Sequence, residues 1–97
     1  SLYNKKIALY EAESVLNMII EEKNNGNEIQ SGDILRHFNH KSEIDISNGI
    51  PNNGVEEAKG AKAINVRAKY KGTESHAILT YKVDENNKIK IVYKRVY

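Results

Sequence analysis

The chain has 97 residues, of which 39% are hydrophobic and 29% charged, and it contains no cysteine. A chain of this length forms one domain around one modest core, so we predict a single domain over residues 1–97. The lack of cysteine excludes disulfide bonds and thiolate metal sites. No apolar run approaches the roughly 20 residues that span a bilayer, so we expect no transmembrane segment in this chain.

A long helix is predicted over residues 2–27. Its apolar residues recur at three- and four-residue steps and form one stripe: Ala8, Leu9, Ala12, Val15, Leu16 and Ile19. Asn4 is a suitable N-cap, and Gly26 is a suitable stop signal. The four glutamates between residues 11 and 22 fall mostly off this stripe, as a solvent-facing side requires.

A short helix and a short strand are predicted next. Residues 31–38, SGDILRHF, begin with a capping serine, Ser31, and carry Asp33 where it suits the positive end of a helix. Residues 43–47, EIDIS, alternate as a strand does. The cluster NGIPNNG, which holds the only proline, predicts a long connection, and residues 55–59, VEEAK, predict a helical stub within it.

Three strands of an antiparallel meander are predicted to follow, over residues 63–71, 75–83 and 88–97, because apolar and polar residues alternate in each. Gly72 and the polar residues 84–87 mark the two hairpin turns. The predicted fold class is therefore α+β, with the long and short helices packed on a curved antiparallel sheet of about four strands. The expected core comprises Leu9, Val15, Leu16, Ile19, Ile34, Leu35, Phe38, Ile64, Val66, Leu79, Tyr81, Ile89 and Ile91.

The charge is divided unevenly along the chain. Residues 1–58 hold five Lys and Arg against ten Asp and Glu, whereas residues 59–97 hold ten against three. Strict alternation places the cations of the meander on the side away from the apolar face: Arg67, Lys69, Lys71, Lys82, Lys88, Lys90 and Lys94. Such a face can bind an anionic polymer by counterion release. The alternative is a solvated sheet exterior whose lysines guard exposed edges. Val92 and Val96 fall on this same side, which indicates partial cover or contact with a partner.

Two groups of side chains are candidates for chemistry. His76, with Thr80 and nearby cations, resembles part of a metal-independent ribonuclease site, in which a histidine transfers protons and a cation stabilises the phosphorane. Asp33, His37 and His40 have a spacing that places them on one helical face, but the sequence offers no companion zinc ligand, and we interpret the histidines as surface residues. We therefore expect no metal, no cofactor and no catalytic residue, with the ribonuclease as the alternative.

The order of elements resembles that of the cystatin-like and nuclear-transport-factor-2-like group of small α+β domains. The stretch NGNEIQSGDILRHF resembles the step between helices in that group, and ENNKIKIVYKRVY resembles its closing strand. The resemblance implies a cone in which the long helix packs into a curved sheet. It also implies a non-enzymatic interaction module, of the kind found in secreted lipoproteins and conjugation machinery of Gram-positive bacteria. No Q-x-V-x-G loop occurs, so protease inhibition of the cystatin kind is not implied.

We therefore expect a non-enzymatic extracytoplasmic binding or assembly module at the surface of a Gram-positive bacterium. Its partner would be a protein, reached through the sheet edge or the mouth of the cone, or an anionic polymer on the basic face, nucleic acid included. The alternative from a different class is a small metal-independent ribonuclease-like toxin domain that uses His76.

Overall fold

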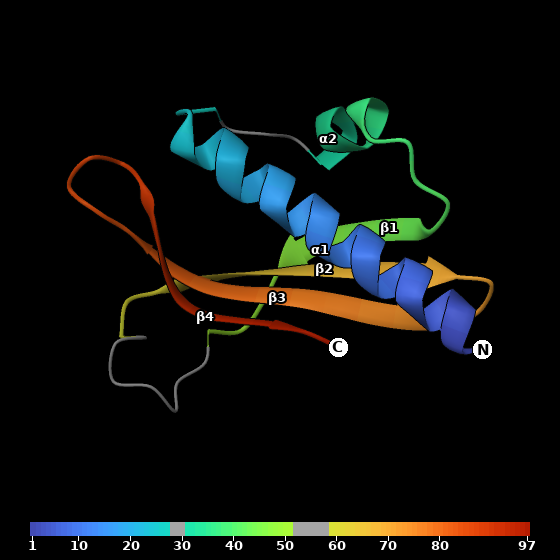
Figure 1. Ribbon diagram of the computed structural model, residues 1–97. Coiled ribbons are helices and arrows are strands. Elements are labelled where there is room, and N and C mark those ends of the chain that lie inside the picture. The colour runs from blue at the N-terminus through green and yellow to red at the C-terminus, as the bar shows by residue number, and fades with distance from the viewer. Residues whose placement is uncertain (28–30, 52–58) are drawn as a thin grey trace.

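A computed structural model describes residues 1–27, 31–51 and 59–97, and it shows an α+β fold of two layers (Figure 1). The elements are, in chain order, α1 (Leu2–Asn24), α2 (Ser31–His37), β1 (Glu43–Asn48), β2 (Lys62–Tyr70), β3 (Thr73–Val83) and β4 (Ile89–Val96). The predicted fold class is confirmed. The predicted stub at residues 55–59 lies, except for its last residue, outside the described residues.

The N-cap of the long helix α1 lies three residues before the predicted one. Ser1 is the N-cap, because its side chain accepts a hydrogen bond from the backbone N–H of Asn4 at 3.3 Å, and Asn4 is already helical. The predicted stop is confirmed, since Gly26 has a φ of +79° and its N–H donates to the carbonyl of Lys23. None of the helices in the described part of the chain is apolar and long enough to cross a membrane.

The four strands form one antiparallel sheet in the order β1-β2-β3-β4, so each strand pairs with its neighbour in sequence. The β2–β3 turn consists of Lys71 and Gly72, both with positive φ, as a two-residue hairpin of matching twist requires. In the β3–β4 turn, the Asp84 carboxylate accepts hydrogen bonds from the backbone of Asn86 and Lys88. Both predicted hairpins are confirmed.

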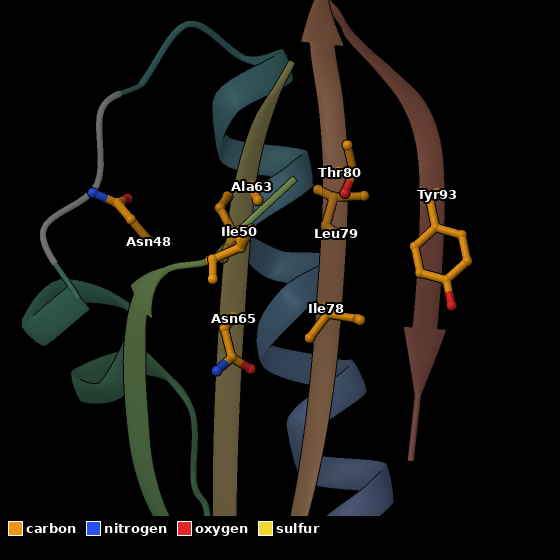
Figure 2. Close-up of a pocket in the computed structure, with 10 residues that line it drawn as sticks. Asn48, Ile50, Ala63, Asn65, Ile78, Leu79, Thr80 and Tyr93 are labelled. Atoms are coloured by element: carbon orange, nitrogen blue, oxygen red, sulfur yellow. The ribbon is translucent and has the colours of Figure 1, made fainter. Parts of the chain in front are cut away.

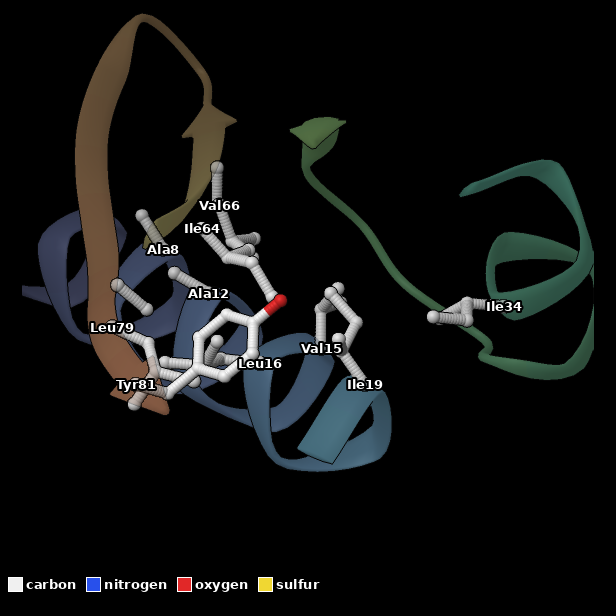
Figure 3. Close-up of a cluster of buried hydrophobic side chains, with 12 residues drawn as sticks. Ala8, Ala12, Val15, Leu16, Ile19, Ile34, Ile64, Val66, Leu79 and Tyr81 are labelled. Atoms are coloured by element: carbon white, nitrogen blue, oxygen red, sulfur yellow. The ribbon is translucent and has the colours of Figure 1, made fainter. Parts of the chain in front are cut away.

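The core lies between α1 and one face of the sheet, mainly over β2 and β3 (Figures 1 and 3). It comprises Ala8, Ala12, Val15, Leu16, Ile19, Ile34, Ile64, Val66, Ala68, Ala77, Leu79 and Tyr81. Four predicted core residues are only partly buried: Leu9, Leu35, Phe38 and Ile89. The prediction for Ile91 is wrong, because it is 50% exposed, on β4, which packs less against α1 than β2 and β3 do.

A β-bulge interrupts β4 and reverses the side on which its residues lie. Thr80 pairs with Tyr93 but Tyr81 pairs with Ile91, so Val92 is an extra residue without a partner on β3. Before the bulge, Ile91 faces the helix; after it, Lys94 does so instead. Lys94 Nζ lies 3.1 Å from both Glu13 Oε2 and Asn17 Oδ1 of α1. The predicted unbroken alternation is therefore wrong, and so is the placement of Lys94 on the basic face.

Both ends of α1 are fastened to the sheet by polar contacts. At the N-terminal end, Lys5 Nζ donates to the carbonyl oxygen of Glu74 at the start of β3 (2.6 Å). At the C-terminal end, the Asn24 side chain accepts from the backbone N–H of Ile89 (2.7 Å), and its carbonyl accepts from Lys88 Nζ (2.6 Å). The helix is thus fixed along its axis as well as packed on its apolar stripe.

A buried carboxylate joins α1 to the segment that enters β1. Glu11 is 5% exposed, and its two oxygens accept hydrogen bonds from the backbone N–H groups of Lys41 (2.8 Å) and Ser42 (2.7 Å). Burial raises the pKa of Glu11, but the hydrogen bonds from Ser42 and Lys41 outweigh it, so the pKa is lower than its ordinary value. This contact therefore requires the ionised form.

Replacing Glu11 with alanine should lower the free energy of unfolding by about 2 to 3 kcal/mol at pH 7, because two backbone donors lose a charged acceptor. The lowered folded-state pKa means that this contribution is complete above the unfolded-state value, near 4.5, and disappears as the pH falls through the folded-state value. Urea unfolding of both proteins from pH 7 to pH 3 should therefore show a difference that shrinks at low pH. Glu21→Ala, at an exposed position of the same helix, is the control. A difference that does not change with pH would contradict this assignment.

Candidate functional site

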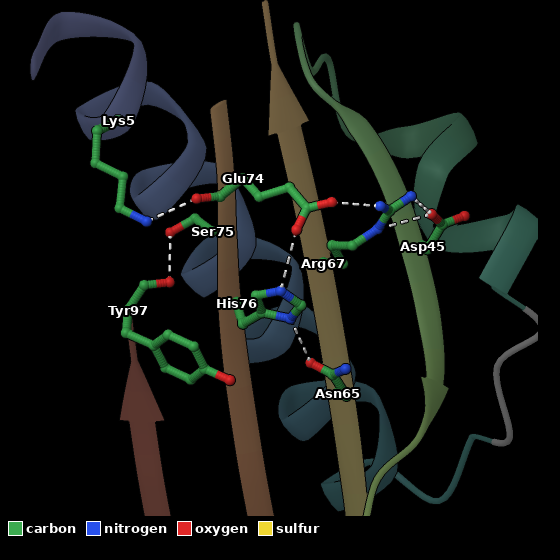
Figure 4. A network of polar contacts seen from close by, with 8 residues as sticks. All are labelled: Lys5, Asp45, Asn65, Arg67, Glu74, Ser75, His76 and Tyr97. Atoms are coloured by element: carbon green, nitrogen blue, oxygen red, sulfur yellow. Dashed lines mark hydrogen bonds and ion pairs between the residues drawn. The ribbon is translucent and has the colours of Figure 1, made fainter. Parts of the chain in front are cut away.

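The side of the sheet opposite α1, here called the open face, carries most of the polar side chains of the strands. Its residues follow from the strand register: Glu43, Asp45, Ser47, Ala63, Asn65, Arg67, Lys69, Glu74, His76, Ile78, Thr80, Lys82, Lys90, Tyr93, Arg95 and Tyr97. Neither helix covers this face, as the views with α1 behind the strands show (Figures 2 and 4).

On β1 and β2 the open face is electrically balanced, because Arg67 binds two carboxylates (Figure 4). Its Nη1 donates to Glu74 Oε1 at 2.6 Å, and its Nε and Nη2 donate to Asp45 Oδ2. The hydrogen bond from Arg67 lowers the pKa of Glu74, and those to Asp45 and Glu74 raise the pKa of Arg67. Lys69 pairs across the strands with Glu43 and Glu74. Arg67 is therefore a neutralised cation, not a free one.

His76 belongs to this cluster and is half-buried, with 23% of its side chain exposed. Its Nδ1 donates to Asn65 Oδ1 at 3.2 Å, its Nε2 lies 3.6 Å from Glu74 Oε2, and its ring stacks on Tyr97 with centroids 5.3 Å apart (Figure 4). Thr80 lies four residues further along β3, which is about 13 Å. The structure thus brings His76 together with Glu74 and Arg67, but not with Thr80.

On β3 and β4 the open face is basic and aromatic. Lys82 and Lys90 lie directly opposite each other, and the bulge then places Tyr93, Arg95 and Tyr97 on this same side. The Arg95 guanidinium lies 4.8 Å from the centre of the Tyr97 ring. Among the described residues of these two strands, the only carboxylate on this side is Glu74, at the far end and bound to Arg67. Cations and rings therefore alternate along β4.

A hollow of about 470 Å³ lies in the middle of the open face (Figure 2). Side chains of β2, β3 and β4 line it together with the segment after β1, and none of its lining residues is charged: Asn48, Gly49, Ile50, Ala63, Ile64, Asn65, Ile78, Leu79, Thr80 and Tyr93. The hollow separates the Arg67 cluster from the lysine pair, and its size is typical of a small-ligand site.

The structure divides the predicted binding residues into three groups. Arg67, Lys69, Lys82 and Lys90 lie on the open face, as predicted. Lys71 lies in the β2–β3 turn over the Tyr70 ring, and Lys88 and Lys94 contact α1, so none of these three lies on the face. Sequence reasoning missed the contribution of Tyr93, Arg95 and Tyr97. The run of three apolar residues at 91–93 was the available signal, because a strictly alternating strand does not contain one.

His37, at the end of α2, and His40, in the segment after it, do not converge on a metal site. His40 Nδ1 lies 2.6 Å from the carbonyl oxygen of Ser42 and its ring stacks on Phe38, while Asp33 pairs with Arg36. Within residues 1–27, 31–51 and 59–97, no three His, Asp or Glu side chains gather as metal ligands do.

Comparison with known proteins finds no matching family model, no matching curated protein and no matching solved structure. The resemblance to cystatin-like and nuclear-transport-factor-2-like domains stays a prediction, and the function has to be argued from the open face.

Arg67→Met should raise the pKa of Glu74, because the substitution removes the hydrogen bond and the positive charge that stabilise the carboxylate. Nuclear magnetic resonance titration of the Glu74 carboxyl carbon would measure it. In the wild-type protein the midpoint should lie below the ordinary value of 4.5, and in the variant it should move up. Lys69→Met, which removes a cation that no carboxylate here binds by hydrogen bond, is the matched control. An unchanged midpoint in Arg67→Met would show that another group stabilises Glu74.

Proposed function

We propose that this chain is a non-enzymatic binding module that holds an anionic polymer, single-stranded nucleic acid, on the open face along β4. The proposal rests on the alternation of cations and aromatic rings on the uncovered side of that strand: Lys90, Tyr93, Arg95 and Tyr97. Proteins that bind single strands without strong sequence preference combine a basic track with aromatic side chains on which bases stack.

The cations of β3 and β4 support a polyanionic partner. Like charges directly opposite each other in an antiparallel pair are unfavourable, and Lys82 and Lys90 have this arrangement. No carboxylate among the described residues pairs with either lysine. A phosphate bound between them relieves the repulsion and releases condensed counterions, which favours binding at low salt.

The aromatic side chains favour a single strand over a duplex. Tyr93 and Tyr97 lie on the uncovered side of β4, where unpaired bases can stack and paired bases cannot. The Arg95 side chain, already placed over the Tyr97 ring, extends this stacking surface. An extracytoplasmic location, like the assembly role that the resemblance implies, stays a prediction.

Charge reversal at the proposed track should weaken binding. We expect Lys90→Glu/Arg95→Glu to reduce the affinity for a fluorescent single-stranded RNA or DNA oligonucleotide at least about tenfold, since phosphate contacts become repulsions. Fluorescence anisotropy at 50 and 200 mM salt measures both the affinity and its salt dependence. Wild-type affinity should fall about twentyfold over this range if about three phosphates are neutralised.

The control must match the change in net charge. Lys6→Glu/Lys41→Glu alters charge by the same amount at exposed positions of α1 and the segment before β1, away from the open face. If the control loses affinity equally, the loss depends on net charge alone and not on the open face. Salt-independent binding, or none, would refute the proposed function.

RNA cleavage is a second candidate function, favoured by the position of His76 beside Glu74. The Glu74 carboxylate, whose Oε2 lies 3.6 Å from His76 Nε2, would accept the proton of a ribose 2′-hydroxyl. The 2′-oxygen would attack phosphorus to give a 2′,3′-cyclic phosphate, and His76 would donate a proton to the departing 5′-oxygen. Glu74 replaces Thr80 in the constellation expected from the sequence.

Cleavage is tested separately from binding. An end-labelled RNA incubated with the protein and a metal chelator should yield products with cyclic phosphate ends, and either His76→Ala or Glu74→Gln should reduce the rate at least about a hundredfold. The same oligonucleotide in DNA form should stay intact, because it lacks the 2′-hydroxyl. Intact RNA after prolonged incubation would exclude this candidate and leave the binding proposal in place.

A further inference from the structure

We infer that the hollow in the open face takes one unpaired nucleobase of the strand held along β4. This inference rests on the proposed function and adds to it a defined site for one base. The hollow is central on the face and lined by uncharged groups (Figure 2). The strand register places cations of β3 and β4 at its borders.

Two side chains form opposite walls of the hollow. Ile50 reaches over β2 and Tyr93 stands on β4, with Ile78 and Thr80 of β3 between them (Figure 2). Strands β2 and β4 are two strand spacings apart, which is about 9.6 Å. That interval accommodates one flat ring system, either packed against the tyrosine ring or lying on the β3 side chains.

The position of Ile50 is fixed by its neighbour. The Gly49 N–H donates to the carbonyl of Ala63 at 3.1 Å, and a Cβ built on Gly49 would meet the Ala63 Cβ at 3.4 Å. This close approach holds the segment after β1 against β2. Ile50 is nevertheless 90% exposed, which is costly for a large apolar side chain unless a partner covers it.

The polar groups of the hollow suit the edge of a base, and its borders suit a phosphate backbone. The Asn65 amide and the Tyr93 hydroxyl supply hydrogen-bond donors and acceptors. Lys82 is the next residue after Thr80 on the open face of β3, and it lies opposite Lys90. At the other end, Arg95 is the next residue after Tyr93 on the open face of β4. A strand running along β4 thus has cations on both sides of the base it inserts.

The first experiment compares an ordinary single-stranded oligonucleotide with an abasic one of equal length and charge. Stacking of a base on an aromatic side chain strengthens binding, so the ordinary strand should bind about tenfold more tightly. Ile50→Ala should bring this ratio down severalfold without changing the salt dependence, because no charge is altered. Ile91→Ala is the control, because Ile91 is also exposed but lies on the helix side of β4. This variant should keep the wild-type ratio.

The outcomes separate the two proposals. Equal binding of ordinary and abasic strands overturns the base site and leaves the polyanion surface standing. A preference for the ordinary strand that Ile50→Ala does not diminish also overturns it, because the base then stacks elsewhere, for example on Tyr97. Loss of the preference in Ile50→Ala but not in Ile91→Ala supports it.

A second measurement examines the hollow without a polymer. The four nucleoside 5′-monophosphates, added singly to isotopically labelled protein, should shift the backbone amide signals of Ala63, Asn65, Ile78 and Thr80 at millimolar concentration. The shifts should be weaker in Ile50→Ala and absent with ribose 5-phosphate. No shift at these amides with any of the four overturns the base site, whatever the oligonucleotides do.

Discussion

The structure depends on one constraint: a single long helix can cover only one face of a four-stranded sheet. The helix α1 places small and branched side chains against β2 and β3, and the alanines at positions 8 and 12, fully buried, allow it to lie close to the strands. The buried side chains of the strands all lie on the side that faces α1, except that of Thr80. Everything on the other side must then be compatible with water or with a partner, and this is where the charges, the aromatic rings and the central hollow lie.

Within that arrangement, the bulge at Val92 decides what the open face contains. Without the extra residue, Tyr93 and Arg95 would exchange sides with Val92 and Lys94, and the face would carry lysine and valine in place of tyrosine and arginine. Bulges are frequent next to functional sites because they redirect side chains without breaking a sheet. Here the bulge moves one cation, Lys94, into a contact with α1, and it moves two aromatic residues into the surface that we propose as the binding track.

Most of the fold was predictable from the sequence, because its signals are local. The period of the long helix, the glycine at its end, and the two hairpin turns each depend on residues close together in the chain. The core was predicted correctly where alternation is regular, in β2 and β3. The prediction failed at Ile91, where cover by a distant helix decides burial.

The candidate site was predictable only in part. Arg67 was correctly placed on the open face, but its neutralisation by Asp45 and Glu74 depends on the register of three strands, which no local pattern in the sequence specifies.

The fastening of α1 at both ends bears on how the open face meets a partner. Lys5 holds the start of the helix to β3, and Asn24 holds its end to the start of β4, so the helix cannot slide along the sheet that it supports. The strands beneath the proposed track are therefore preorganised. Association then loses little backbone entropy, and the cost of binding falls mainly on the lysine and arginine side chains. Free and bound forms of the described strands should superpose closely, with rotamer changes confined to the surface.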